Sequence, residues 1–379
     1  MKKFLTALAI SLWAIARAEA ATYYVSPAGS NANPGNEALP FLSLTYAAQR
    51  LQPGDTLYVR AGTYPESLIN QIPSGTSWEA PVTVAAYPGE TVILRPPGGH
   101  HVLELHGRTK SYILLKNLKL DGARVRSHVV RIGYTSGQPD STAHHIRLDG
   151  VEVMNGKSQG ILVTAGSHRC EFIDLNVHHN GSDRRDHGLY LQGSFHVVSR
   201  GSYAHNKSYG IHAYGAGSDN TFIGAQIHRN RVGVQSTQDR NLWINNLVYA
   251  NKAGGIITNN GDDAKYLHNT VVFNGRWGIN INYNYVARAQ LINNIVYGNT
   301  WGIRDAGIDT VKSNNLLTDA GFADAANHDY RLTQGSSAID AGMPLPEVTT
   351  DYLRASRPDG KGWDIGAYEH PHPPAPVVR

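Results

Sequence analysis

The sequence predicts an all-β fold, a right-handed parallel β-helix with an N-terminal capping helix. A short phrase that begins with glycine recurs seven times between Gly160 and Asp305, at intervals of 22 to 28 residues. The intervening runs are rich in Val, Ile and aromatic side chains, and none has the period of an amphipathic helix. Units this short cannot bury an apolar face alone, so neighbouring units must stack into a solenoid.

The repeated phrase marks the coils of this solenoid. Its glycines are Gly160, Gly188, Gly210, Gly233, Gly255, Gly278 and Gly302. A second marker, a β-rich run that ends in asparagine, keeps the same interval at Asn180, Asn206, Asn230, Asn251, Asn274 and Asn299. Glycine and asparagine tolerate left-handed backbone best, so we expect them to form the corners between strands.

The chain divides into a leader, one domain and a tail. Residues 1–20 carry two lysines, an apolar run and a small-residue cleavage site, which predicts a secretory signal peptide. Residues 21–369 form a single β-helix domain, in which residues 42–51 have helical composition and are expected to cap the open end. Residues 370–379 form a Pro-rich tail that we expect to be disordered. We therefore expect a secreted or periplasmic monomer with no membrane span.

Charge points to an anionic partner. Residues 95–231 contain 17 Lys or Arg against 10 Asp or Glu, so the first half of the repeat region is basic. Nucleic acid is not expected, because the chain is predicted to be exported and shows no nucleic-acid-binding motif.

Cys170 is the only cysteine, which excludes a disulfide framework and a cysteine metal site.

Strand alternation sorts the repeated phrase into faces. The residue after each glycine is apolar and predicts the core: Ile161, Leu189, Ile211, Val234, Ile256, Ile279 and Ile303. The second and fourth residues after the glycine are predicted to face outward. They include Tyr190, His212, Gln235, Asn280, Arg304, Gln192 and Tyr214. Asp186, Arg231 and Arg276, two residues before a glycine, share this outward parity if the strand extends that far. His187 falls on the inward parity and is interpreted as a corner residue.

These outward residues suit β-elimination of a uronic acid polymer. That reaction requires neutralisation of the C6 carboxylate, removal of the C5 proton and protonation of the leaving O4. Tyr190 and His212 are predicted to share the two proton transfers, on the condition that a cation lowers the tyrosine pKa. Asp186 is predicted to orient His187 or His212. Arg231 is predicted to neutralise the carboxylate by paired hydrogen bonds.

The remaining outward side chains are predicted to bind the polymer. They are Gln192, Tyr214, Gln235, Arg276, Asn280 and Arg304. No metal site is predicted, because the histidine pairs at residues 100–101 and 178–179 lack a third ligand. A calcium cofactor rests only on the weak pattern Gly261-Asp-Asp263.

The two ends of the domain resemble those of a known superfamily. The opening Tyr23-Tyr-Val-Ser-Pro-Ala-Gly-Ser30 and Gly54-Asp-Thr-Leu-Tyr-Val-Arg-Ala-Gly-Thr-Tyr64, and the closing Ser337-Ala-Ile-Asp-Ala-Gly342 and Asp364-Ile-Gly-Ala-Tyr-Glu369, carry the resemblance. They are similar to segments of secreted β-helix polysaccharide lyases, the superfamily of chondroitinase B, some alginate lyases and some pectate lyases. The resemblance implies the β-helix architecture and a polysaccharide ligand.

The sequence therefore predicts a secreted lyase that cleaves an acidic polysaccharide. A uronan C5-epimerase remains an alternative, because it begins with the same proton abstraction. A glycoside hydrolase needs two outward carboxylates, and no second one lies beside Asp186 in these columns. A non-catalytic glycan-binding protein would use the same groove without proton transfer.

Overall fold

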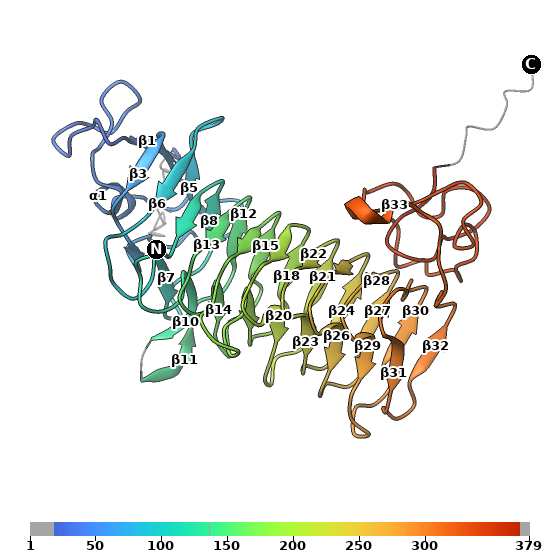
Figure 1. Cartoon of the computed structure of the whole chain (residues 1–379). Helices are drawn as coiled ribbons and strands as arrows, with labels where there is room; N and C mark the ends of the chain where they lie inside the picture. The colour runs from blue at the N-terminus through green and yellow to red at the C-terminus, as the bar shows by residue number, and fades with distance from the viewer. Residues whose placement is uncertain (1–18, 136, 372–379) are drawn as a thin grey trace, which may run out of the picture.

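The computed structural model describes residues 19–135 and 137–371, which form a parallel β-solenoid (Figure 1). Most of the predicted signal peptide, residues 1–18, and most of the predicted tail, residues 372–379, lie outside the described residues. Successive coils contribute strands to three sheets, which we name A, B and C. Strands of one sheet pair in parallel with the strands one coil before and one coil after, so side chains at equivalent positions form columns.

The strands have the following bounds. Sheet A contains β1 (Thr22–Val25), β2 (Thr56–Val59), β5 (Val82–Ala86), β8 (Ile113–Lys116), β12 (Ile146–Asp149), β15 (Glu171–Ile173), β18 (Val197–Ser199), β21 (Thr221–Ile223), β24 (Leu242–Ile244), β27 (Lys265–Leu267), β30 (Gln290–Ile292) and β32 (Val311–Ser313). Sheet B contains β3 (Gly62–Tyr64), β6 (Val92–Leu94), β9 (Lys119–Asp121), β13 (Glu152–Met154), β16 (Asn176–His178), β19 (Ser202–Ala204), β22 (Gln226–His228), β25 (Leu247–Tyr249) and β28 (Thr270–Val272). Sheet C contains β4 (Leu68–Ile69), β7 (Leu103–His106), β10 (Val130–Thr135), β14 (Ile161–Val163), β17 (Leu189–Leu191), β20 (Tyr209–Ala213), β23 (Val232–Ser236), β26 (Gly254–Thr258), β29 (Trp277–Ile281) and β31 (Trp301–Asp305).

A few elements lie outside the parallel ladders. They are α1 (Leu44–Ala48), β11 (Gln138–Thr142), β33 (Phe322–Asp324), the 3-10 helix η1 (Ala325–Asn327) and β34 (Asp329–Leu332). Helix α1 is shorter than the predicted 42–51, and it packs beside β1 and β2 at the N-terminal end of the solenoid (Figure 1). Its role as a cap stays a prediction. Neither helix of the described residues is long and apolar enough to cross a membrane.

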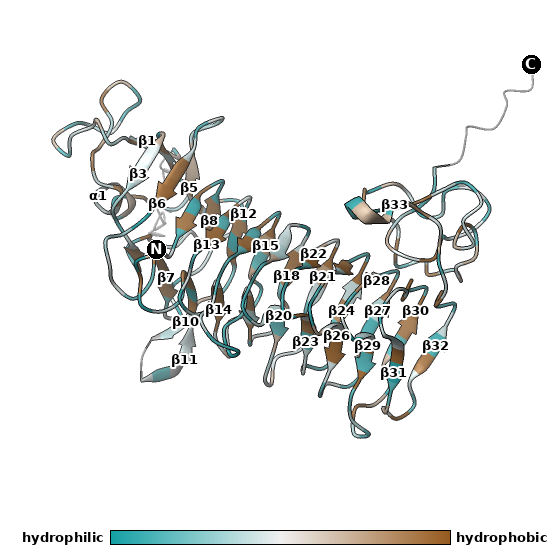
Figure 2. Cartoon of the chain, viewed as in Figure 1, coloured by the Kyte–Doolittle hydropathy of each residue, from teal (hydrophilic) through white to brown (hydrophobic). Residues whose placement is uncertain are grey.

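The core lies where the repeats predicted it. The residue after each glycine is fully buried in six successive coils, at Ile161, Leu189, Ile211, Val234, Ile256 and Ile279. These side chains pair in register from coil to coil. Ile303, in the last coil of sheet C, is partly buried and packs against the same core. Figure 2 shows the apolar strand positions repeated along the solenoid.

The repeated glycines are required by close packing and not by left-handed backbone, which corrects the prediction. Gly210 does not have a positive φ. A Cβ atom there would lie 2.6 Å from Ile227 Cγ2 and 2.7 Å from Asn230 Nδ2. The repeated glycines from Gly160 to Gly278 therefore let the backbone approach the asparagine column beneath them.

The asparagines form a ladder of side-chain hydrogen bonds, and the neighbouring residues make the left-handed corners. Asn230 Nδ2 donates to the carbonyl of Tyr203 at 2.8 Å, and its Oδ1 accepts from the N–H of Asn206 at 3.0 Å. The left-handed residues of this corner include His205 and Arg229, with φ of 56° and 54°. Such backbone is unfavourable for these residue types, and hydrogen bonds to the adjacent coils hold it in place.

The C-terminal segment packs on the last coils of sheets A and B. Ile365, Ala367 and Tyr368 pack in one cluster with side chains of β25 and β28. Leu345 and Val348 pack in another cluster with side chains of β24, β27 and β30. Neither cluster includes a side chain of sheet C, so its outer face is left uncovered by this segment.

Candidate active site

Sheet C presents the predicted outward column in register. Tyr190 of β17 pairs with His212 of β20, which pairs with Gln235 of β23. Asn280 and Arg304 continue the column on β29 and β31. The rings of Tyr190 and His212 stack, with centroids 4.9 Å apart and planes 18° apart. The prediction that these two residues share one face on neighbouring coils is confirmed.

His187 joins this pair, although strand alternation predicted an inward side chain. Its Nε2 lies 2.9 Å from His212 Nδ1 in a hydrogen bond, and its ring centroid is 5.2 Å from that of Tyr190. In the next coil Tyr209 occupies the equivalent position and contacts His187, with centroids 4.8 Å apart. The alternation breaks because the chain bends at the repeated glycine. We name these residues, with the adjacent Tyr214, the ring cluster: His187, Tyr190, Tyr209, His212 and Tyr214.

Burial controls ionisation in the ring cluster. It lowers the pKa of His187 to about 4 and that of His212 to about 2, so both imidazoles are uncharged at neutral pH. His212 is 7% exposed, and its Nε2 has no hydrogen-bond partner among the described residues. Burial also raises the pKa of Tyr190, and a hydrogen bond with Gln192 opposes that shift. The tyrosine pKa is therefore shifted opposite to the predicted direction, because burial outweighs its polar contacts.

Asp186 organises a turn and does not orient a histidine, which corrects its predicted role. Its carboxylate accepts hydrogen bonds from Ser158 Oγ at 2.9 Å and from the N–H groups of Ser182 and Asp183 at 2.8 Å each. Its side chain is buried, and none of its hydrogen bonds reaches either histidine of the ring cluster. Its negative charge acts on His187 only by opposing the effect of burial on the pKa.

A cluster of cations lines the corner where the chain passes from sheet B to sheet C. A cavity of about 500 Å³ is lined there by Arg184, Lys207, Arg231, Lys252 and Arg276, together with Ala253. We name the five basic residues the cationic cleft. They come from successive coils, and none of them makes an ion pair with another described residue.

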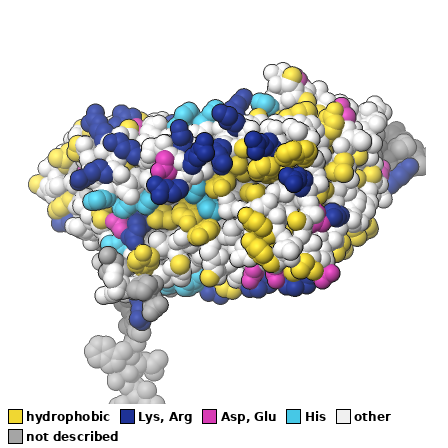
Figure 3. All heavy atoms as spheres, turned by 60° about the horizontal axis from the view of Figure 1, so that its bottom comes forward, with side chains coloured by type: hydrophobic (Ala, Val, Ile, Leu, Met, Phe, Trp, Pro, Cys, Tyr) yellow, Lys and Arg dark blue, Asp and Glu magenta, His cyan; other side chains and the backbone are white. Residues whose placement is uncertain are grey.

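Several basic side chains elsewhere on the solenoid are paired with carboxylates. Arg147 contacts Glu171 at 2.8 Å, and Arg240 contacts Asp219 at 2.7 Å. Figure 3 shows Lys and Arg side chains gathered near histidines on the side of the molecule that carries sheet C. Like charges brought together without a counter-charge repel one another, so a bound anion stabilises such a cluster.

The sequence identified only part of this cleft. Arg231 was predicted to neutralise the carboxylate and Arg276 to bind the polymer, and both line the same cavity. Arg184, Lys207 and Lys252 were missed. The signal lay in the asparagine ladder, because Lys207, Arg231 and Lys252 each directly follow one of its asparagines. Stacked coils bring residues at equivalent positions side by side.

The other predicted binding residues are distributed along the face. Tyr214 and Gln235 line a second cavity, of about 450 Å³. Asn280 and Arg304 lie two and three coils beyond Gln235, roughly 10 and 14 Å at the usual strand spacing. Arg304 lies over the ring of Trp301, 4.9 Å from its centroid. The structure therefore does not bring Asn280 and Arg304 to the ring cluster.

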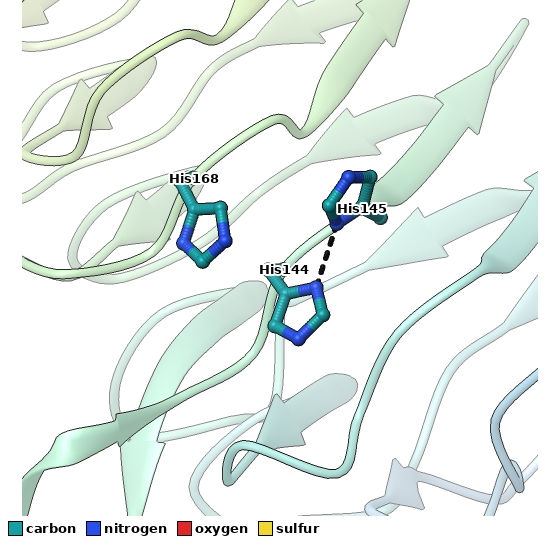
Figure 4. A group of neighbouring side chains, drawn as sticks. All are labelled: His144, His145 and His168. Carbon is teal, nitrogen blue, oxygen red and sulfur yellow. Dashed lines mark hydrogen bonds between the residues drawn. The ribbon is translucent and has the colours of Figure 1, made fainter. Parts of the chain in front are cut away.

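Three histidines lie close together at another corner of the solenoid. His144, His145 and His168 offer nitrogens within 4.8 Å of one another, and Nδ1 atoms of the first two are 2.6 Å apart (Figure 4). The rings of His144 and His168 stack at 4.8 Å, so their nitrogen lone pairs run side by side and do not converge on one point. A similar contact recurs at His178 and His179, at 2.8 Å.

The two aspartates of the weak calcium pattern, Asp262 and Asp263, both pair with Arg288. Asp263 Oδ1 accepts from Arg288 Nε at 2.7 Å, and Asp262 Oδ2 accepts from Arg288 Nη2 at 3.2 Å. Both carboxylates therefore have a counter-charge in the protein itself.

Known proteins share this architecture and part of this sequence. Residues 23–231 match the family of Pel9A-like right-handed β-helix regions, and residues 159–320 match right-handed β-helix regions in general. The chain belongs to the Pel9A-like right-handed β-helix family. The predicted fold class and superfamily resemblance are thereby confirmed.

Curated relatives of this Pel9A-like protein match it over short segments. Pectate lyase PEL9 of Emericella nidulans is 43% identical over 76 residues, which is 20% of this chain and 18% of that protein. The uncharacterized protein YwoF of Bacillus subtilis is 39% identical over 71 residues, which is 19% of this chain and 15% of that protein. The chain thus matches less than a fifth of the length of either relative.

Solved structures match over most of the chain. Pectate lyase Pel9A superposes with a TM-score of 0.67 and 16% identity, covering 92% of this chain and 96% of that one. XylC in complex with xylose superposes with a TM-score of 0.59 and 11% identity, covering 92% of this chain and 99% of that one. A rhamnogalacturonan lyase superposes with a TM-score of 0.57 and 16% identity, covering 78% of this chain and 87% of that one. At these identities the likeness shows a common fold.

Proposed function

We propose that the protein is a secreted polysaccharide lyase that cleaves a uronic-acid-containing polysaccharide by β-elimination. The observation that carries this proposal is the cationic cleft beside the ring cluster on the open face of sheet C. Lys207 of the cleft lies two residues before Tyr209 of the ring cluster, so the two features border each other. The cationic cleft binds anions, and the ring cluster contains groups that transfer protons.

The spacing of the cations suits an acidic polymer. The cleft residues come from successive coils, and coils stack about 4.8 Å apart. A pyranose residue lengthens an extended polysaccharide by a comparable amount, so a chain along the solenoid axis can bring successive carboxylates past successive coils. A single small anion would leave most of these cations without a partner.

The chemistry divides among three groups. The cationic cleft neutralises the C6 carboxylate and thereby makes the C5 proton more acidic. His212, which is uncharged and hydrogen-bonded to His187, accepts that proton. The C4–C5 double bond forms as the C4–O4 bond breaks, and the electron pair leaves with O4. Tyr190, whose raised pKa keeps its hydroxyl protonated, donates a proton to O4.

Access to the base requires a small side-chain movement. Nε2 of His212 is buried, and the rings of Tyr190 and Tyr214 pack against that imidazole. Tyr214 is 44% exposed, so its ring has room to turn when the polymer binds. Exposed side chains change rotamer in picoseconds to nanoseconds, which does not limit turnover.

The reaction is tested by incubating the protein with a panel of uronic acid polymers. A lyase produces the ultraviolet absorbance of an unsaturated uronate. New reducing ends without that absorbance would indicate a hydrolase, and inversion at C5 without chain cleavage would indicate an epimerase. Binding without any change in the polymer would leave a glycan-binding protein, and each of these three results contradicts the lyase assignment.

The role of the cationic cleft is tested by removing one of its charges. Arg231→Ala should weaken binding of the cleaved polymer roughly ten- to a hundredfold, because hydrogen bonds to charged groups contribute about 1.5–3 kcal/mol. Affinity electrophoresis measures this change. Arg240→Ala is the matched control, because it removes an arginine that is paired with Asp219 on another corner. Equal effects of the two substitutions would contradict a specific role for the cleft.

A further inference from the structure

A second cleft lies on the other side of the ring cluster and differs in chemistry from the cationic cleft. Its cavity of about 450 Å³ is lined by Tyr214, Gln235, Thr237, Asn259, Tyr283 and Tyr285, among others. We name it the tyrosine–amide cleft. None of its described lining residues has an ionisable acidic or basic side chain other than tyrosine.

Three exposed aromatic rings dominate this cleft. Tyr214 is 44% exposed, Tyr283 is 42% exposed and Tyr285 is 56% exposed. Tyr283 and Tyr285 stack on each other, with centroids 5.1 Å apart and planes 9° apart. They belong to the loop between β29 and β30, which projects from the edge of the solenoid in Figure 1. Large exposed aromatic side chains grouped in a concave surface are characteristic of a binding site.

Amide groups supply fixed hydrogen-bonding partners beside the rings. Asn282 Nδ2 donates to Asn259 Oδ1 at 3.0 Å, and Asn280 Nδ2 donates to Asn282 Oδ1 at 3.2 Å. This chain of amides runs across adjacent coils and fixes the orientation of Asn259 in the cleft wall. Neutral donors and acceptors next to aromatic faces match a pyranose ring, which has hydroxyl groups at its edge and apolar C–H groups on its faces.

We propose that the tyrosine–amide cleft is a second glycan subsite that binds an uncharged pyranose residue. This proposal rests on the proposed function. If both hold, the natural polymer contains neutral sugars as well as uronic acids. The cleft is placed for this role. Tyr214 contacts Tyr190 with ring centroids 5.8 Å apart, so a neutral sugar here lies next to the residue being cleaved.

The test uses uncharged oligosaccharides derived from galactan, xylan and mannan, with binding measured by saturation-transfer NMR and calorimetry. At least one should bind the wild-type protein, and Tyr283→Ala and Tyr285→Ala should each weaken that binding by roughly tenfold, the effect of losing an aromatic contact. Raising the salt concentration should leave the affinity unchanged, because no charge pairs with the sugar. Leu353→Ala, which removes a side chain that is 59% exposed elsewhere, should have no effect.

Two results would overturn the inference: no binding of any neutral probe, or binding that survives the combined Tyr283→Ala and Tyr285→Ala substitutions. Both are distinct from failure of the proposed lyase activity. Binding of a neutral probe with the expected variant pattern supports the subsite even if no uronan is cleaved. Cleavage of a uronan without binding of any neutral probe overturns the subsite alone.

Discussion

Tyr190 is the residue on which the proposed chemistry depends most. Tyr190→Phe keeps the ring that stacks on His212 and removes only the hydroxyl. Because acid–base groups typically contribute ~10²–10⁴-fold, we expect turnover to fall on that scale while KM stays nearly unchanged. Steady-state kinetics on the cleaved polymer measure both quantities. Tyr209→Phe is the control within the ring cluster, and similar losses in both variants, or near-normal turnover of Tyr190→Phe, would remove the assignment.

Individual residues also show where sequence reasoning ends. Strand alternation placed Tyr190 and His212 on one face, and the structure agrees. The same rule failed for His187, because a bend at the repeated glycine turns the preceding residue to the outer face. It also missed the role of Asp186, because a carboxylate that binds backbone N–H groups in a turn has no periodic signature. The ionisation of Tyr190 could not be predicted from the sequence either, because burial is the largest influence on its pKa.

At the scale of elements, the asparagine ladder holds adjacent coils together. Asn230→Ala leaves the buried N–H of Asn206 and the buried carbonyl of Tyr203 without their partners. Each unsatisfied buried group costs about 1–3 kcal/mol, so for the two groups we expect a loss of about 2–6 kcal/mol and a clearly lower melting temperature. Asn36→Ala removes an exposed side chain that makes one hydrogen bond, and it should change stability by less than about 1 kcal/mol. Equal melting temperatures for the two variants would contradict the ladder's role.

The sequence repeats predict those structural features that recur in every coil. The interval between glycines and the apolar residue after each one were sufficient to predict the coils and their core, because both recur in every unit. The conformation of the corners was predicted less well. His205 and Arg229 adopt left-handed backbone because neighbouring coils constrain them, and that constraint acts between residues distant in sequence.

For the whole molecule, the arrangement of covered and open faces decides where a polymer can bind. The sequence predicted a basic first half of the repeats, and the structure concentrates unpaired cations in one cleft. The C-terminal segment packs on the last coils of sheets A and B and leaves sheet C uncovered, which no local pattern in that segment indicated. The cationic cleft, the ring cluster and the tyrosine–amide cleft follow one another across sheet C.

Three buried histidines make the stability of the whole molecule sensitive to acid. Burial lowers the pKa of His187 to about 4, that of His196 to about 3 and that of His212 to about 2. In the unfolded chain each has a pKa near ~6.5, so below that pH the unfolded state binds more protons than the folded state. Their stabilising effect is complete above about pH 6.5 and is lost as the pH falls toward the folded-state values.

We therefore expect the melting temperature to fall steadily from pH 6.5 to 4.5, since each histidine contributes a slope of about 1.4 kcal/mol per pH unit. His196→Asn isolates one contribution. His196 Nδ1 accepts the N–H of Cys170 at 3.1 Å, and Asn220 in the next coil accepts the N–H of His196 at 2.8 Å. An asparagine at this position can therefore accept the N–H of Cys170, as Asn220 accepts the N–H of His196, without a titrating group. The variant should match the wild type near pH 7.5 and melt at a higher temperature below pH 5.5. A melting temperature that does not change with pH, or equal pH dependence in both proteins, would show that these histidines are not uncharged in the folded state.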